Sequence, residues 1–425
     1  MILLLISFLV MMLLGVPIAN SLLFSSVLYL MTHDIPMQMA FQTTTSAISE
    51  SFVLISVPFF ILAANVMNTG GITKKIFGFA NTIVGWIPGG LGHANIASSV
   101  IFSGMSGAAI ADAGGLGAIE LQAMKDEGYD EDFSLAITGA SSIIGPIIPP
   151  STPAILFGVS GGVSIGMLFL GGLVPGLLMA IAMGVFVYIQ SKKRHYPHRA
   201  FPTPHEVGHS FIQALFPLLT PVIIIGGIMS GIYTPTEAAV IAVVYALILT
   251  LTTRELKLSA IPNIVLETAA NTVNVMFIIA SASIFAWILT IEQVPQSMST
   301  FMLKNINNPI VALLLINIIL VVVGTFMETA AAISILTPIL MPICLTFGID
   351  PIHFGIMCIL NLMIGLLTPP IGMVLYVLSS VAKVPFEKIV KAIWPYILLL
   401  IGILLLITFV PQIVTFLPYA TLGTK

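Results

Sequence analysis

An uncharged run from Phe133 to Ser191 constrains the fold of this chain more than any other feature. One crossing of a bilayer takes about 20 apolar residues, so the run crosses more than once. Yet the stretch Gly145-Pro146-Ile147-Ile148-Pro149-Pro150-Ser151-Thr152-Pro153 stands where the hydrocarbon core would be. Proline breaks the helical ladder, and broken backbone persists at membrane depth only where it is buried in protein or lines a cavity. The sequence therefore predicts an interrupted helix whose freed carbonyls are candidate cation ligands.

A second interruption, Gly365-Leu366-Leu367-Thr368-Pro369-Pro370-Ile371-Gly372, lies at a fixed distance from the first, since 365 − 145 = 220 and 369 − 149 = 220. Six identities share this offset: Gly104/Gly324, Gly128/Gly348, Asp130/Asp350, Gly145/Gly365, Pro149/Pro369 and Pro150/Pro370. Paired Gly/Pro-interrupted segments in corresponding halves are typical of a transporter's binding site. We therefore predict two sequence repeats.

The composition defines the fold class. The 425 residues are 58% hydrophobic and 7% charged, with a mean hydropathy of +1.12. The apolar runs are continuous and do not alternate as the strands of a membrane barrel do. We predict an all-α polytopic membrane protein without a separate soluble domain. The segment from residue 1 to about 31, broken near Gly15-Val16-Pro17, is interpreted as one long or bent span and not as a cleaved signal.

Each half is predicted to hold a re-entrant helical hairpin and a broken transmembrane helix. The segment near Ile76–Pro88 either lies in the interface or crosses at a tilt. We favour five crossings plus one hairpin per half, and such an odd number of crossings inverts the two repeats. The polar linker carries Lys and Arg, which predicts a cytoplasmic location. The expected segments are a first repeat at 1–190 (hairpin about 92–122, broken helix about 133–160), a linker at 191–210, and a second repeat at 211–425 (hairpin about 309–346, broken helix about 354–381).

Hydroxyl and carbonyl oxygens at the hairpin tips and helix breaks predict two sodium sites. A desolvated Na⁺ takes about five or six oxygens, and a hard cation accepts carbonyls and hydroxyls readily. The predicted ligands are Ser103, Ser106, Gly145 and Ile148 in the first site, and Gly324, Thr325, Gly365 and Thr368 in the second. A uniform offset of 220 pairs Ser103 with Val323 and Ser106 with Phe326, so the second site is expected to use more backbone oxygen.

An anionic substrate is expected between the two cation sites, because half-helix N-termini favour negative groups. No basic residue lies in the predicted hairpins or broken helices to bind a carboxylate. The candidate substrate residues are Ser106, Asp112, Ser151, Thr152 and Glu328. A water-exposed carboxylate in the mouth of the hairpin is the alternative for Asp112. The sequence has no Walker loop, and its apolar segments hold no nucleophile–base pair or metal-ligand set, so we predict no enzymatic activity.

Three motifs give the chain a family resemblance. Gly-Pro-Ile-Ile-Pro-Pro-Ser at 145–151, Thr-Pro-Thr-Glu-Ala-Ala at 234–239 and Gly-Leu-Leu-Thr-Pro-Pro-Ile-Gly at 365–372 resemble the large membrane subunit of TRAP (tripartite ATP-independent periplasmic) transporters. The likeness covers essentially the whole chain and is greatest to the separate-chain sialic acid type. It implies an elevator mechanism, Na⁺ coupling and a bacterial inner-membrane location. It also implies two partners, a small four-helix membrane subunit and a periplasmic substrate-binding protein, and this chain has no segment that supplies either.

The resulting hypothesis is a Na⁺-coupled secondary transporter subunit that imports an organic acid, with sialic acid as its substrate. Three alternatives remain open at this point. The first is a TRAP transporter for another carboxylate, such as a C4-dicarboxylate. The second is a stand-alone Na⁺/carboxylate symporter. The third, and least favoured, is a channel, because channels usually build their pore by oligomeric symmetry.

Overall fold

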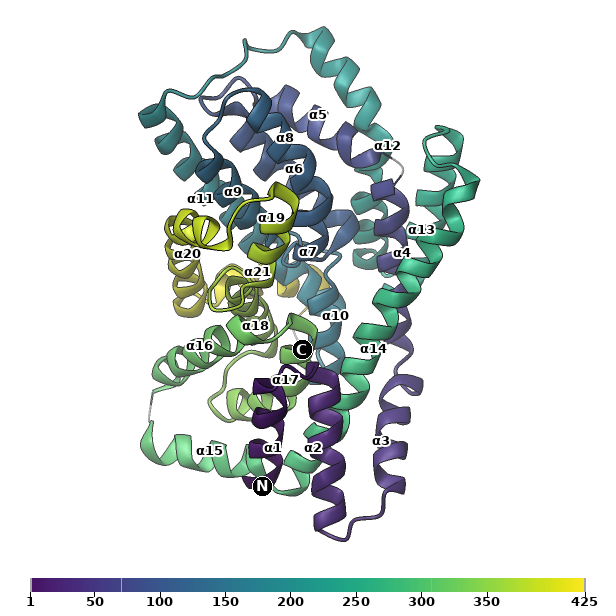
Figure 1. Ribbon diagram of the computed structural model, residues 1–425, viewed down its shortest axis with the longest axis vertical. Coiled ribbons are helices and arrows are strands. Elements are labelled where there is room, and N and C mark those ends of the chain that lie inside the picture. Colours follow the sequence, from purple (N-terminus) through teal and green to yellow (C-terminus); the bar gives the residue numbers. More distant parts are fainter. Residues whose placement is uncertain (1, 70, 307, 424–425) are drawn as a thin grey trace.

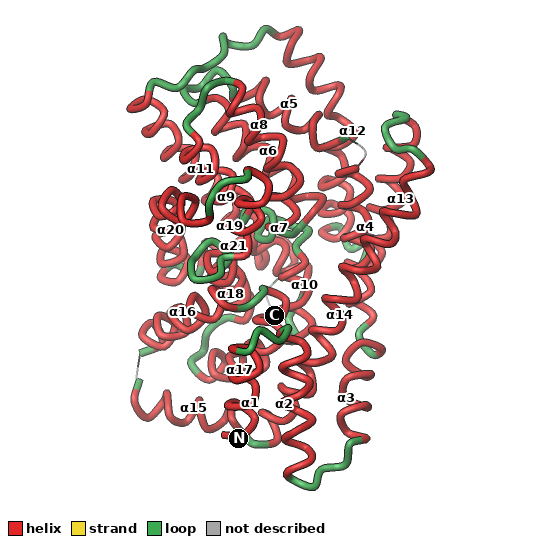
Figure 2. Tube along the Cα trace, viewed as in Figure 1, coloured by secondary structure: helices red, strands yellow, loops and turns green. Residues whose placement is uncertain are grey.

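The computed structural model describes residues 2–69, 71–306 and 308–423, except for the side chains of residues 105, 106 and 303. This part of the chain is helical almost throughout and contains no strand, as predicted (Figures 1 and 2). The elements up to the linker are α1 (Ile2–Leu13), α2 (Ile18–Thr32), α3 (Gln38–Ser49), a 3₁₀ turn (Phe52–Ile55), α4 (Ser56–Thr69), α5 (Ile72–Val84), α6 (Gly90–Ser106), α7 (Ala109–Ala111), a π-helical turn (Asp112–Leu116), α8 (Gly117–Asp126), α9 (Glu131–Ser142), α10 (Thr152–Gly161) and α11 (Ile165–Arg194).

The helices after the linker continue the same pattern of long and short segments. They are α12 (Pro204–Met229), α13 (Pro235–Thr252), a 3₁₀ turn (Leu258–Ala260), α14 (Ile261–Ile291), α15 (Val294–Asn305), α16 (Pro309–Phe326), α17 (Thr329–Thr346), α18 (Pro351–Gly365), α19 (Met373–Ala382), α20 (Phe386–Phe409) and α21 (Gln412–Leu422). In the described part, eight helical stretches are long and apolar enough to cross a membrane: 52–69, α11, α12, α13, 258–291, α16, α17 and α20.

For the first 90 residues, the structure corrects one expectation and describes a segment that the sequence left undecided. The single span predicted for residues 1–31 is wrong, because α1 and α2 are two short helices that pack side by side (Figure 1). Their 12 and 15 residues each fall short of the 20 needed for a crossing. The undecided segment near Ile76–Pro88 forms most of α5, whose 13 residues extend about 20 Å and bury one face. Helix α5 is therefore too short to cross a hydrocarbon core of about 30 Å upright.

One side of the molecule is a packed group of helices, α2, α3, α4, α13 and α14, which we call the scaffold side (Figure 1). Helix α4 packs against α13 and α14, and α14 also contacts α2 and α3. The Thr-Pro-Thr-Glu motif begins α13 through reciprocal bonds: the Glu237 amide donates to Thr234 Oγ1 over 3.3 Å, and the Thr234 amide donates to Glu237 Oε2 over 2.8 Å. This capping box satisfies two amides at the helix start.

The other side holds the two interrupted helices. The first consists of α9 and α10, separated by residues 143–151, and the second of α18 and α19, separated by residues 366–372. Elements α6 to α8 occupy 90–126, where the sequence predicts the first hairpin, and the arm α6 contacts α8 and the π-helical turn. The arms of the second hairpin diverge. Helix α16 lies mainly against α18, whereas α17 lies mainly against α14, α15 and α10.

The two halves of the chain are interleaved at these interrupted helices. Helix α10 packs along α17 of the second hairpin, and α19 packs against α7, α8 and the π-helical turn of the first. A Cβ added at Gly161 of α10 would lie 3.1 Å from Thr337 Cγ2 of α17, and one added at Gly114 would lie 3.5 Å from Val377 Cγ1 of α19. Each broken helix therefore contacts the hairpin of the opposite half.

The linker is shorter than predicted, because α11 extends to Arg194 and α12 begins at Pro204. Arg194 Nη1 lies 2.9 Å from both Asp130 Oδ2 and Asp132 Oδ1, and Arg199 lies 3.1 Å from Glu127 Oε1. The guanidinium of Arg194 lowers the pKa of the Asp132 carboxyl through its hydrogen bonds. These exposed pairs hold the linker against the loop that follows the first hairpin.

Candidate functional site

The tip of the first hairpin lies directly against the first helix break. Gly107 ends α6 with φ of +59°, a backbone conformation that glycine adopts without strain. A Cβ at this position would lie 2.4 Å from the carbonyl oxygen of Pro150 and 3.3 Å from the amide nitrogen of Thr152. Backbone meets backbone here, so the absence of a side chain at residue 107 permits the approach.

The first hairpin and the first break both carry oxygens suited to a cation. The Ser103 side chain is 1% exposed, and its Oγ donates to the carbonyl oxygen of Val100 over 2.5 Å, which leaves its lone pairs free. No donor from the described part of the chain reaches the carbonyl oxygen of Gly145 or Ile148. Ser106 is the last residue of α6, but its side chain lies outside the described residues. The arrangement fits a hard cation that takes hydroxyl and carbonyl ligands.

Ser151 and Thr152 shape the far side of the first break. Ser151 Oγ donates to the carbonyl oxygen of Pro146 and accepts from the Ala154 amide over 3.1 Å, so this side chain is the N-cap of α10. Thr152 is the first residue of α10. The structure thus gives Ser151 a structural role in fixing the break. The predicted contact of both residues with a substrate stays a prediction.

The second hairpin and the second break meet glycine to glycine. A Cβ built on Gly365 would lie 2.4 Å from the carbonyl carbon of Gly324. Thr325 Oγ1 donates to the carbonyl oxygen of Val322, and Thr368 Oγ1 donates to that of Ile364, both over 2.8 Å. Each hydroxyl therefore keeps lone pairs that can ligate a cation. All four residues predicted for the second sodium site belong to this one contact region.

Asp112 is buried within the first hairpin. Its side chain lies on the π-helical turn and is 2% exposed, so it is not a water-exposed carboxylate in the mouth of the hairpin. Its Oδ2 has no hydrogen-bond partner among the described residues and lies 3.9 Å from a Cβ built on Gly145. The carboxylate therefore faces the first helix break. A π-helical turn interrupting a helix is frequent at functional sites.

Glu328 has a different environment. It is half-buried at the start of α17, where its Oε2 accepts from the amides of Ala330 over 2.9 Å and Ala331 over 3.3 Å. The side chain is thus an N-cap, and a negative group at this end of a helix is stabilising. Its carboxylate fixes the second tip, and its predicted contact with substrate stays a prediction.

Sequence reasoning missed a second buried carboxyl group, Glu120. It is 1% exposed, and its Oε1 accepts from Ser98 Oγ over 2.6 Å. Sequence reasoning also missed Asn95, which is fully buried and hydrogen-bonds the hairpin arm α6 to α9. Glu120 stands eight residues after Asp112 in the same predicted hairpin. Its position inside the predicted intramembrane hairpin was the available signal, because any intramembrane ionisable residue is a functional candidate.

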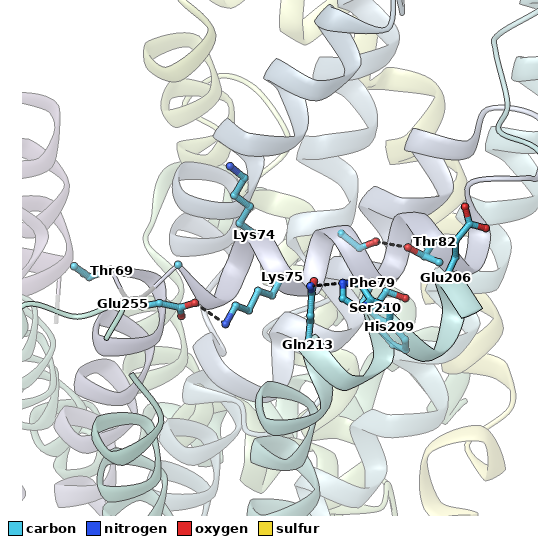
Figure 3. A pocket seen from close by; sticks show the side chains of 12 residues that line it. Thr69, Lys74, Lys75, Phe79, Thr82, Glu206, His209, Ser210, Gln213 and Glu255 are labelled. Atoms are coloured by element: carbon cyan, nitrogen blue, oxygen red, sulfur yellow. Dashed lines mark hydrogen bonds and ion pairs between the residues drawn. The ribbon is translucent and has the colours of Figure 1, made fainter. Parts of the chain in front are cut away.

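A cavity of about 690 Å³ opens away from the tips, between α5, α12 and the turn after α13 (Figure 3). Lys75 Nζ pairs with Glu255 Oε1 over 2.5 Å at one end, and Gln213 Nε2 lies 2.8 Å from His209 Nε2 at the other. None of the predicted site residues lines this cavity. It is a polar surface feature beside α5 and α12, separate from the helix breaks.

Two short letter patterns match enzyme motifs, but neither stands in the structural setting of its motif. His205-Glu206-Val207-Gly208-His209 has the spacing of a zinc protease, yet Glu206 is exposed and caps α12 by accepting from the Thr203 amide. No group of three or more metal-ligating side chains occurs among the described residues. Residues 158–162 match Gly-x-Ser-x-Gly but end α10, whereas a nucleophile elbow follows a strand.

Comparison with known proteins identifies the family. The family described as "Tripartite ATP-independent periplasmic transporter, DctM component" matches residues 5–413. The chain belongs to this family. As a TRAP large permease whose described residues include eight stretches long and apolar enough to span, it is a multi-pass protein of the bacterial inner membrane, as predicted. The transporter class is therefore established, and the relatives named below are permeases.

Two relatives and one solved structure illustrate the likeness. The chain is 45% identical to the sialic acid TRAP transporter large permease protein SiaM of Vibrio cholerae, covering 96% of each chain. It is 38% identical to the 2,3-diketo-L-gulonate TRAP transporter large permease protein YiaN of Escherichia coli, covering 94% of each. The Alcanivorax borkumensis YdaH transporter superposes with a TM-score of 0.69 at 15% identity over 90% of each chain, which supports the fold alone.

Proposed function

We propose that this TRAP large permease imports an organic acid, with sialic acid as the substrate, by coupling its movement to Na⁺. The paired contact of a hairpin tip with a helix break carries the proposal. At both contacts, buried hydroxyls and break carbonyls offer oxygen ligands without a basic side chain nearby. The 45% identity to SiaM supports the choice of sialic acid.

The proposed sites use residues of both breaks. Ser103, Ser106, Gly145 and Ile148 would hold the first Na⁺, and Gly324, Thr325, Gly365 and Thr368 the second. The substrate carboxylate would lie between them, with Ser106, Asp112, Ser151, Thr152 and Glu328 around it. The positive N-terminal end of the α10 dipole would favour the anion, and bound Na⁺ would offset the charge of Asp112.

Movement of the substrate is proposed to follow an elevator mechanism. The two hairpins and the two broken helices would slide as one body against the scaffold side. Their interleaved packing supports this, because α10 with α17 and α19 with the first hairpin join both halves into one unit. The two halves would be inverted repeats. The proposed partners are a small four-helix membrane subunit and a periplasmic protein that delivers the substrate.

Uptake into proteoliposomes tests the proposal. Vesicles would carry this chain with its small membrane subunit and receive labelled sialic acid, with or without the binding protein, in external Na⁺ or K⁺. The proposal expects uptake only with both Na⁺ and the binding protein. Na⁺-driven uptake without the binding protein would indicate a stand-alone symporter. Uptake of a C4-dicarboxylate in place of sialic acid would refute the substrate, and non-saturable flux would indicate a channel.

Asp112 offers a second test within the same assay. Asp112→Asn keeps the shape of the buried side chain and removes its charge. Uptake at saturating Na⁺ should fall at least about tenfold, because an intramembrane charge facing a proposed cation site is normally functional. Glu387→Gln, at the exposed start of α20, is the matched control and should transport normally. Equal uptake by both variants would exclude Asp112 from the mechanism.

A further inference from the structure

A buried asparagine joins the first hairpin to the first broken helix. Asn95 of α6 donates from Nδ2 to Thr138 Oγ1 over 2.8 Å and accepts at Oδ1 from Ser141 Oγ over 2.6 Å. Both partners belong to α9, and all three side chains are at most 1% exposed. Because the amide both donates and accepts, it fixes the height and the rotation of α6 relative to α9. We call these three residues the first clamp.

The second half contains the same device with different partners. Asn361 of α18 donates from Nδ2 to Asn317 Oδ1 of α16 over 2.6 Å. The Asn317 amide in turn donates to Thr408 Oγ1 of α20 over 2.9 Å. The three side chains are at most 5% exposed. We call them the second clamp, and it joins the second hairpin arm to the second broken helix.

The clamp asparagines of the two hairpins precede the proposed cation ligands by the same number of residues. Asn95 precedes Ser103 by eight residues, and Asn317 precedes Thr325 by eight. Eight helical residues extend about 12 Å, so each asparagine fixes its arm about two turns before the hydroxyl.

On the broken helices, Ser141 precedes Gly145 by four residues and Asn361 precedes Gly365 by four, which is about one helical turn. The sequence distances to the paired glycines Gly145 and Gly365 therefore also agree between the halves.

The clamps also correct the register between the halves. The broken helices keep the predicted offset, since 361 − 141 = 220, but the hairpin arms differ by two residues, since 317 − 95 = 222. At this offset Ser103 corresponds to Thr325, so both proposed cation sites have a hydroxyl at the same place. The identity Gly104/Gly324 is then coincidental. A Cβ on Gly104 would lie 2.3 Å from Pro221 Cβ of α12, whereas Gly324 meets a helix break.

We propose that the two clamps are positioning groups that hold each hairpin tip at the height its Na⁺ site requires. This inference rests on the proposed function, because it assigns the clamps to the Na⁺ affinity of those sites. Ligand sites need their groups held within about 0.5 Å, which buried and hydrogen-bonded neighbours achieve. The clamp residues themselves do not touch the ion. They set the distance between the tip hydroxyl and the break carbonyls.

Neighbouring serines give a matched test of the first clamp. Ser141→Ala removes the bond to the hairpin, whereas Ser142→Ala removes only a bond to the carbonyl oxygen of Gly139 in its own helix. Both side chains are at most 1% exposed. We expect the Na⁺ concentration for half-maximal uptake to rise about fivefold in Ser141→Ala and to stay unchanged in Ser142→Ala. The maximal rate at saturating Na⁺ should stay near that of the wild type in both.

Two conservative substitutions at Thr138 test the hydrogen bond to Asn95 separately from the volume of the side chain. Thr138→Val keeps the volume and loses the acceptor of the Asn95 amide, whereas Thr138→Ser keeps the acceptor. Only the valine variant should require more Na⁺. In the second half, Asn361→Ala should weaken Na⁺ dependence, and Cys358→Ala, equally buried on α18, should not. The Na⁺-dependent rise in thermal unfolding temperature of the purified complex, measured against K⁺, reports binding without transport.

The outcomes separate the two proposals. Wild-type uptake and unfolding that are equal in Na⁺ and K⁺ would refute the proposed function itself. A Na⁺-dependent wild type whose Ser141→Ala and Ser142→Ala variants have the same Na⁺ requirement would overturn the clamp proposal alone. A variant that does not fold is replaced by the Thr138 pair, which changes the bond with little change in volume. A uniform loss of maximal rate without a change in Na⁺ requirement would also contradict positioning.

Discussion

A methyl group at Gly365 should disable the second tip-and-break contact. The added Cβ would lie 2.4 Å from the carbonyl carbon of Gly324, whereas ordinary contacts begin at 3.4 Å, so the backbones must separate by 3.4 − 2.4 = 1.0 Å. The added Cβ is fixed on the backbone of residue 365 and its contact atom is backbone of Gly324, so no side-chain rotation relieves the clash. Overpacking of this kind costs about 1 to 3 kcal/mol. A shift of this size also exceeds the roughly 0.5 Å that a ligand site tolerates.

The expected result for Gly365→Ala is at least a tenfold rise in the Na⁺ concentration for half-maximal uptake in proteoliposomes. A tenfold change corresponds to about 1.4 kcal/mol, within the range estimated from the clash. Gly402→Ala is the control for replacing a helical glycine by alanine, because a Cβ at this position has nothing within 4 Å. Wild-type Na⁺ dependence in Gly365→Ala would refute the reasoning.

Three further predictions follow from the structure. Gly107→Ala should reduce uptake more than tenfold, because its φ of +59° and a contact at 2.4 Å both disfavour a side chain; normal uptake would contradict the tip geometry. Glu328→Ala should lower unfolding stability by about 1 kcal/mol through loss of the α17 cap, as measured by denaturation in detergent. Arg194 lowers the pKa of Asp132, so their pair stabilises the fold above the ordinary carboxyl pKa and loses this effect as the pH falls through the lowered value. The difference in unfolding temperature between wild type and Asp132→Asn should therefore shrink from about pH 7 to about pH 3, and a constant difference would exclude the pair.

The positions of both helix breaks were predictable from sequence, because glycine and proline at membrane depth leave few alternatives. The segment that forms α5 was not, since an apolar stretch of its length suits either an interfacial helix or a tilted crossing. The break between α1 and α2 was predicted, but the packing of the two helices against each other was not. An apolar run interrupted at Gly15-Val16-Pro17 has the same composition whether the chain continues across the membrane or folds back.

The candidate site was predictable in its residue types and less so in their roles. Ser151 and Glu328 read as possible ligands from sequence, but the structure uses both as helix caps. The cap roles depend on where each helix begins, and the predicted contacts of both residues with a substrate stay predictions. The burial of Asp112, the second carboxyl at Glu120 and the clamp at Asn95 depend on which helix faces which. Sequence periodicity does not report that packing.

The interleaving of the halves has a consequence for biogenesis. Helix α10 leaves the ribosome early, but the surface against which it packs is α17, which is made more than 150 residues later (329 − 161 = 168). The first break therefore stays without its cover while the second half is synthesised and inserted. Final assembly of both sites has to wait until α19 has also entered the membrane. A chain truncated after α16 would insert its early helices and still lack a complete transport unit.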